Sequence, residues 1–201
     1  MVTGRKAEQS EATRSDLLKV ARNLFAEQGY AGTSTEEIVK QAGVTRGALY
    51  HHFRDKKALF QAVYEQVEKE LGEDLVEIAL RLPQASGWER LLAGADGFLD
   101  ACRDPAVQQI ALIDAPSVLG WETWRSIDAE HGLGLLRAGL QAAMDAGEIE
   151  SHPVAPLAHI LLAALMEAAL MIARADDVEA ARVEVGATVL RLLEGLRADR
   201  P

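Results

Sequence analysis

A short run of hydrogen-bonding side chains follows a glycine near the N-terminus of the chain. Residues 45–51 supply a hydroxyl, a guanidinium, a phenol and an imidazole within seven positions. A helix that begins after Thr45 would present these groups on its first two turns, where the positive end of the helix dipole also favours an anion. Such side chains donate to base edges and phosphates. The pattern therefore predicts a surface that contacts nucleic acid.

Two short helices are predicted to position this run. The first begins at Ser34, with Glu37 three residues later as in a capping box, and the second runs from Thr45 to about His52. Gly43 lies at the turn between them, where a positive φ permits a sharp change of direction. Their shared core is expected to comprise Ile38, Ala42, Val44, Leu49 and Phe53.

The rest of the chain is rich in helix formers, so we predict an all-α fold of about nine helices. A first helix is expected at about 10–28, and a long linking helix from about residue 55. Further helices are expected at 86–101, after Pro105, across a glycine-interrupted segment at 116–146, and at about 153–174 and 177–197. We expect a DNA-binding domain at 1–57 and a larger helical domain at 58–201.

The charge distribution supports contact with phosphate at one end only. The whole chain carries −10, yet residues 1–57 carry +3 and residues 58–201 carry −13. The single cysteine cannot form an internal disulfide. The longest apolar stretch, residues 157–173, is shorter than a membrane span and includes His159 and Glu167. We therefore expect a cytoplasmic location and no membrane partner.

Residues 33–59 resemble the N-terminal domain of the TetR family of bacterial transcriptional regulators. The matching residues are Thr33, Ser34, Ile38, Ala42, Gly43, Val44, Thr45, Gly47, Tyr50, His52, Phe53, Lys56 and Leu59. Val39 stands where the family often has alanine, a departure on the core side that concerns packing rather than DNA contact.

The resemblance implies a role for each matching surface residue. The residues at positions that commonly hold the DNA backbone are Thr33, Ser34, Tyr50 and Lys56, and those on the face that commonly reads bases are Thr45, Arg46, Gly47 and His51. Arg46 is the first candidate for a guanine contact because it is the only long bidentate donor at the helix start. Packing within the domain is the alternative for Tyr50, and the better interpretation for His52.

The family also implies a C-terminal helical domain that binds a small-molecule effector and dimerises. Candidate effector-binding residues are Phe98, Asp114, Trp121, Trp124, His131, Met144, His159 and Met166. The alternative for these residues is an ordinary place in the core or on the surface. No spacing indicates a metal site, and no cofactor is expected.

The resemblance to the TetR family implies a ligand-controlled repressor of transcription. The apolar faces of the helices at 153–174 and 177–197 are expected to form a homodimer, with burial inside one chain as the alternative. A twofold dimer predicts a palindromic operator in double-stranded DNA, from which a small-molecule ligand would release the protein. A helical enzyme lacks support, because no nucleophile elbow or phosphate loop is present. A small-molecule carrier that no longer binds DNA is the other alternative, and Arg46 and Lys56 argue against it.

Overall fold

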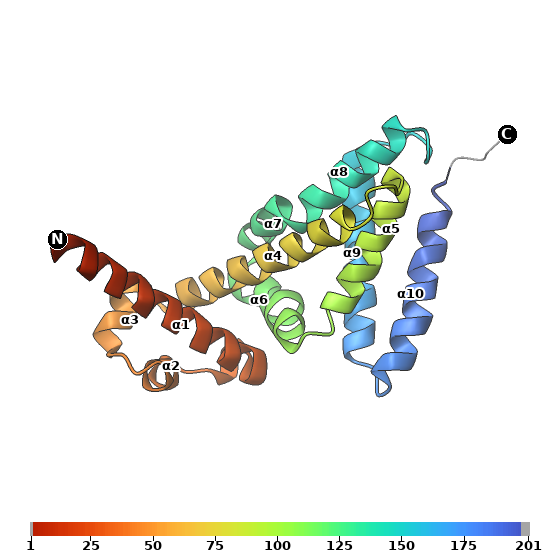
Figure 1. The fold of residues 1–201 in the computed structure, drawn as a ribbon. Coiled ribbons are helices and arrows are strands. Elements are labelled where there is room, and N and C mark those ends of the chain that lie inside the picture. The colour runs from red at the N-terminus through yellow and green to blue at the C-terminus, as the bar shows by residue number, and fades with distance from the viewer. Residues whose placement is uncertain (1, 198–201) are drawn as a thin grey trace. The chain divides into compact units, whose positions relative to one another are not determined.

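The computed structural model describes the backbone of residues 2–197 and the side chains of residues 7–197, and within them the fold is all-α as expected (Figure 1). The elements are α1 (Val2–Gly32), α2 (Thr35–Gln41), α3 (Arg46–His52), α4 (Lys56–Leu80), α5 (Gly87–Ala101), the π-helix η1 (Val107–Asp114), α6 (Ala115–Leu119), α7 (Trp121–Glu130), α8 (Gly132–Asp145), α9 (Val154–Ala173) and α10 (Val178–Glu194).

The described residues hold more helices than the nine predicted, because the segment at 116–146 is divided. Gly120 adopts φ 85° between α6 and α7, and α8 begins at Gly132 directly after His131. The first helix is also longer than expected. It begins at Val2 and continues to Gly32 across a break at Gly29, where φ is 71° and ψ is 170°.

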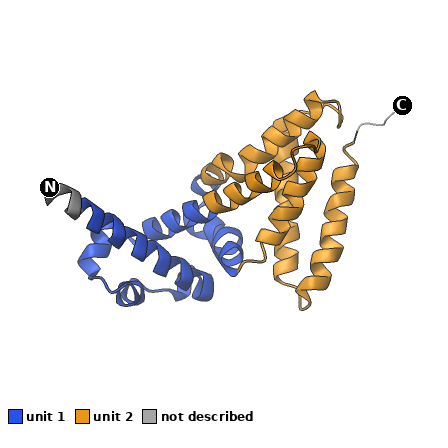
Figure 2. Cartoon of the chain, in the orientation of Figure 1, with its two compact units in different colours: residues 1–67, 105–124 blue, residues 68–104, 125–201 orange. Residues whose placement is uncertain are grey.

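The chain forms two compact units, which differ from the expected division at residue 57 (Figure 2). Unit 1 comprises residues 1–67 and 105–124, and unit 2 comprises residues 68–104 and 125–201. The second piece of unit 1 contains η1 and α6, and η1 packs against α1. A segment that lies far along the sequence therefore belongs with the helix-turn-helix by its contacts.

The core of unit 1 confirms much of the predicted packing. Ile38, Leu49 and Phe53 are buried, while Ala42 and Val44 are half-buried. Helices α1 and α4 contribute further large buried side chains, among them Leu17, Leu24, Phe25, Leu59, Phe60, Val63 and Tyr64. This core sets the orientation of α2 and α3 through α1, which contacts both of them.

In unit 2, α5, α8, α9 and α10 pack on one another. The first turn of α5 is secured by a capping box between Ser86 and Glu89. Arg182 of α10 forms ion pairs with Asp96 at 2.6 Å and Asp100 at 2.8 Å, both on α5. Its guanidinium is largely buried, so these charge-assisted contacts fix which face of α10 turns toward α5.

Cys102 provides a test of the packing of unit 2. Burial, with a further contribution from the charge of Glu68, raises the pKa of its thiol to about 12. At pH 8 only about one thiol in ten thousand would be ionised, and the thiolate is the reactive form. We expect Ellman's reagent to leave the folded protein unmodified at pH 8 and to titrate one thiol in guanidinium chloride. Rapid labelling of the native chain would contradict the described packing.

Candidate nucleic-acid interface

The two short helices of unit 1 are capped by the residues that the sequence indicated. The Ser34 hydroxyl accepts from the Glu37 amide at 3.1 Å, and the Thr45 hydroxyl accepts from the Ala48 amide at 3.1 Å. Gly43 adopts φ 65° in the turn between them. The predicted reciprocal half of the capping box is wrong, because the Glu37 carboxylate accepts from the Gln28 and Gln41 side chains instead.

One face of α3 is turned to solvent. Arg46, Gly47, Tyr50 and His51 are exposed there, while Leu49 is fully buried on the opposite side. Tyr50 is 41% exposed, so its ring does not fill the core. These positions repeat at helical spacing and form a single stripe with Thr45 before them. The stripe is short and polar, as a helix that enters the major groove requires.

Arg46 is held along this surface by two neighbours. Its Nη1 lies 3.2 Å from Oε1 of Glu36 on α2, and its guanidinium carbon lies 5.6 Å from the centre of the Tyr50 ring. The pKa of Glu36 is lowered by hydrogen bonds that its carboxylate accepts from the Glu36 backbone amide and from the Thr35 hydroxyl. The charge of Arg46 makes a smaller contribution. Glu36 therefore stays charged at neutral pH and offers Arg46 a partner that DNA must replace.

The expectation that Thr33 contacts DNA needs correction. Its side chain is 2% exposed, and its hydroxyl lies 2.9 Å from the Gly29 carbonyl oxygen and 3.1 Å from that of Leu24. A buried hydroxyl whose proton is already directed at carbonyl groups is not available to a phosphate. Thr33 instead stabilises the end of α1. Ser34, the next residue, is exposed, although its hydroxyl oxygen also caps α2.

Lys56 also makes contacts within unit 1. Its Nζ donates to the carbonyl oxygen of Tyr30 at 2.7 Å and to that of Thr33 at 2.9 Å, and it lies 4.1 Å from the centre of the Tyr30 ring. Two of the three ammonium donors are thereby used. Lys56 thus ties the start of α4 to the end of α1, whatever it contributes to DNA contact.

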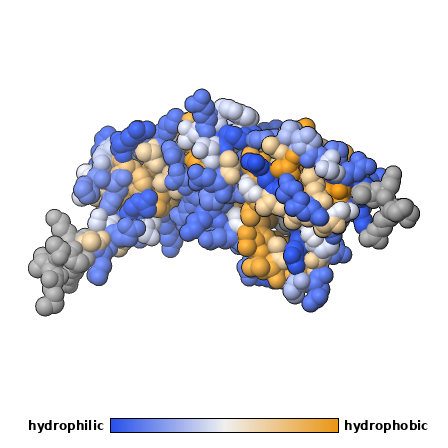
Figure 3. Space-filling model, turned by 90° about the horizontal axis from the view of Figure 1, so that it is seen from above, coloured by the Kyte–Doolittle hydropathy of each residue, from blue (hydrophilic) through white to orange (hydrophobic). Residues whose placement is uncertain are grey.

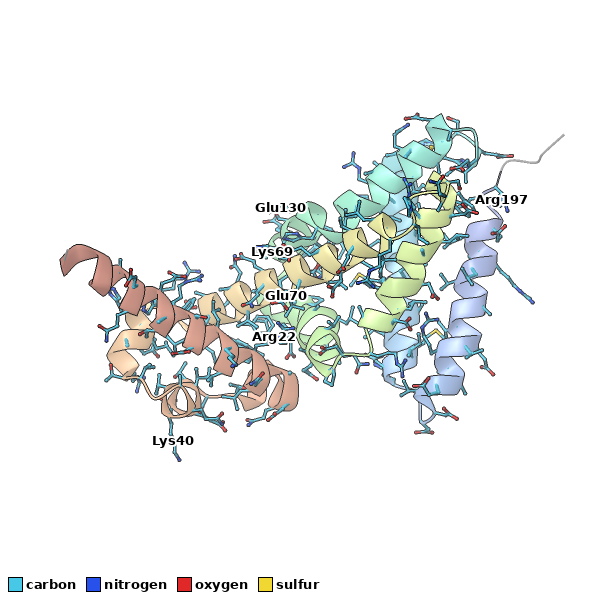
Figure 4. The ribbon with its side chains drawn as sticks, in the orientation of Figure 1. Arg22, Lys40, Lys69, Glu70, Glu130 and Arg197 are labelled. Atoms are coloured by element: carbon cyan, nitrogen blue, oxygen red, sulfur yellow. The ribbon has the colours of Figure 1, made fainter. Side chains whose placement is uncertain are left out.

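Two cations that sequence reasoning did not single out also lie on this part of unit 1. Lys40 projects from α2 into solvent (Figure 4), and Arg54 is exposed directly after α3. The available signal was the place of Lys40 on the polar side of α2 and of Arg54 directly after the predicted second helix. Arg14 lies with its guanidinium carbon 5.5 Å from the centre of the Phe53 ring. The side chains of Arg5 and Lys6 lie outside the described side chains.

The candidate effector-binding residues are divided between the two units. Asp114, Trp121 and Trp124 lie in unit 1, and the others (Phe98, His131, Met144, His159 and Met166) lie in unit 2. Trp121 is exposed, and its ring lies 5.3 Å from that of the buried Trp124. The Asp114 carboxylate accepts a hydrogen bond from the Tyr30 amide and makes no capping hydrogen bond to α6.

Sequence reasoning missed Asp128, a buried acid on α7. Burial raises its pKa, while a hydrogen bond from Arg125 and the charges of Arg125, His159 and His131 oppose this effect. Arg125 Nη1 lies 2.8 Å from its carboxylate. The signal in the sequence was helical spacing, because Asp128 shares a face with the buried Trp124 and Ile127. Two predicted polar candidates, His131 and His159, therefore lie near enough to Asp128 to influence its pKa.

Two family models match the chain. Residues 17–63 match the model described as bacterial regulatory proteins of the tetR family, and residues 88–196 match a tetracycline repressor-like C-terminal domain. The first match covers the helix-turn-helix and the start of α4. The second covers most of unit 2 and includes the η1–α6 segment, which packs on α1.

Individual relatives agree with these matches. A TetR-family transcriptional regulator from Pectobacterium atrosepticum is 34% identical, with a TM-score of 0.81 over 96% of this chain and 98% of that one. The transposon Tn10 TetC protein of Escherichia coli is 29% identical over 77% of each chain. The transcriptional regulator AcrR of Shigella flexneri is 46% identical, over 38% of this chain and 35% of its own length.

Substituting Arg46 tests the base-reading face. We expect Arg46→Ala to cost roughly 1–3 kcal/mol of discrimination between a specific and a random duplex, about 5- to 150-fold in Kd. Arg54→Ala is the control. It removes the same charge from an exposed arginine that is paired with Asp55, so it should weaken both duplexes alike. Competition titrations at fixed salt provide the measurement, and unchanged site preference in Arg46→Ala would rule out its assigned role.

Proposed function

The chain belongs to the TetR family of bacterial transcriptional regulators, and on this premise we propose that it is a repressor that a small-molecule ligand releases from a palindromic operator. DNA binding and transcriptional regulation come with the family. The sign of regulation, the palindrome and the ligand are the proposed parts.

The observation that carries the proposal is the exposed stripe of α3. Thr45 caps the helix, Leu49 anchors it in the core, and Arg46 and Tyr50 are left at the surface. A helix held in this way presents its first turn to a groove without needing to unfold or rotate. Gly47 adds no side chain there, so a DNA backbone can approach α3 closely.

A second copy of the chain is proposed to cover α9 and α10. On α9 the stripe Ile160, Ala163, Glu167 and Met171 is exposed, opposite the buried face of the helix. On α10 the exposed stripe is Val183, Ala187 and Leu190, turned away from the side that Arg182 directs toward α5. Two helices from each copy would bury these stripes in a four-helix bundle, with alanines allowing close approach.

The composition of α9 supports the need for such a partner. Among the described residues it is the one helix long and apolar enough to cross a membrane, and 33% of its most apolar window is buried within the chain. Glu167 lies exposed in its second half, where a bilayer would penalise a charge. We therefore propose a dimer interface and a cytoplasmic location. In the view of Figure 3, several apolar patches lie among hydrophilic surface.

The effector is proposed to bind within unit 2. Phe98, Met144 and Met166 are half-buried apolar side chains, and His131 and His159 lie near the buried Asp128. Apolar walls with a few placed polar groups are the usual composition of a small-molecule site. The other candidates, Asp114, Trp121 and Trp124, lie in unit 1, where the Asp114 carboxylate accepts from the Tyr30 amide. No enzymatic activity forms part of the proposal.

Selection of bound sequences from random duplex DNA tests the operator directly. At a stated salt concentration, we expect enrichment of a palindrome whose half-sites are about one helical turn, or 34–36 Å, apart. Arg46→Ala protein carried through the same selection is the control and should enrich that site less strongly. If the folded wild-type chain enriches nothing at low or moderate salt, the repressor proposal fails and a small-molecule carrier becomes the leading alternative.

Substitutions in the exposed stripes test the dimer. Ile160 and Val183 are 67% and 71% exposed, so Ile160→Asp and Val183→Asp should leave a single chain folded. A buried, unpaired carboxylate at the interface would disfavour association, and light scattering should then report a monomer. Leu80→Asp, on the 73% exposed Leu80 of α4, is the matched control and should stay dimeric. A dimer in both stripe variants would place the interface elsewhere.

A further inference from the structure

The carboxylate of Asp114 contacts a segment that lies far away in the sequence. Asp114 is the last residue of η1 and has helical φ and ψ, so the chain continues directly into α6, and its side chain makes no capping hydrogen bond there. Its Oδ2 instead accepts from the backbone amide of Tyr30 at 2.7 Å, across 84 positions of sequence. Both residues lie in unit 1.

The Tyr30 amide needs this acceptor because of the break at Gly29. The Thr33 amide donates to the Gly29 carbonyl oxygen at 3.2 Å, so a new helical turn begins at Tyr30. The first amides of a turn have no acceptor within it. A Cβ at residue 29 would stand 3.4 Å from Asp114 Oδ2 and 3.1 Å from Gln109 Nε2, so glycine also allows η1 to approach.

The same turn is held at its other end by Lys56, through the carbonyl oxygens of Tyr30 and Thr33. A carboxylate at the amide end and an ammonium at the carbonyl end both complement the dipole of the turn. Ser34, which caps α2, follows immediately. The position of α2, and with it that of α3, therefore depends on a turn that one residue from η1 helps to hold.

We propose that Asp114 is a positioning residue for DNA binding. Its carboxylate holds the Tyr30–Gly32 turn in the conformation from which α2 and α3 present their exposed face. The segment Val107–Leu119 thereby influences the position of the helix-turn-helix through one hydrogen-bond acceptor, the Asp114 carboxylate. The inference rests on the operator binding proposed above. It identifies a contact through which a residue within the C-terminal family match can affect the DNA-binding face.

Three variants separate the acceptor from the charge and from stability. Asp114→Ala removes the acceptor and one negative charge, while Asp114→Asn removes the charge but keeps an oxygen that can accept. Glu122→Ala is the matched control, because it removes an exposed acid on α7 in the same unit. The operator affinity of each folded variant is measured by fluorescence anisotropy at fixed salt, together with its melting temperature.

We expect Asp114→Ala to weaken operator binding about fivefold to tenfold, the range typical of a lost helix cap. Asp114→Asn should stay within about twofold of wild type. Glu122→Ala should not weaken binding, because loss of an acid favours approach to phosphate. Hydrogen exchange of the peptide that spans residues 29–32 should quicken in Asp114→Ala and stay slow in Asp114→Asn.

A merely structural role would lower the melting temperature of Asp114→Ala without changing its operator affinity, and that result would overturn the inference. Equal weakening in Asp114→Asn and Asp114→Ala would also overturn it. If Asp114→Ala does not fold, exchange in the wild-type chain decides, because loss of protection at residues 29–32 on operator binding contradicts a held turn. A wild-type chain that selects no operator defeats the proposed function instead.

Discussion

The ammonium of Lys56 lies against two backbone carbonyl oxygens at the end of α1, and the helix-turn-helix depends on this contact. The turn that it closes follows the break at Gly29 and leads directly into the cap of α2. Backbone groups exposed by such a break must find partners elsewhere. Here the partners are supplied by Thr33 beside α2, Lys56 at the start of α4 and Asp114 of η1.

This arrangement explains why some predictions from sequence succeeded and others failed. The caps at Ser34 and Thr45, the turn at Gly43 and the buried faces of α2 and α3 depend on neighbours within a few positions, so local patterns identified them. The burial of Thr33 depends on carbonyl oxygens that the break at Gly29 exposes, which no local pattern revealed.

Long-range contacts account for the remaining differences. The place of Asp114 beside Tyr30, and the grouping of residues 105–124 with the N-terminal helices, follow from packing between segments far apart in sequence. Asp128 was missed for a related reason. An acid on a helix that carries two other, exposed acids, Glu122 and Glu130, resembles a solvated charge until its neighbours are known. By contrast, the apolar character of α9 and α10 was visible from composition, and exposed apolar side chains such as Ile160, Met171 and Val183 lie on these helices.

The π-helix η1 has a consequence for how this sequence tolerates change in length. A π-helix accommodates an extra residue where an α-helix would not, and such segments often occur at functional sites. Deleting one residue from an α-helix rotates everything after it by about 100°, whereas a π-helix can absorb the deletion by returning to α-helical hydrogen bonding. The segment that carries Asp114 should therefore tolerate the loss of one residue better than the neighbouring α-helices do.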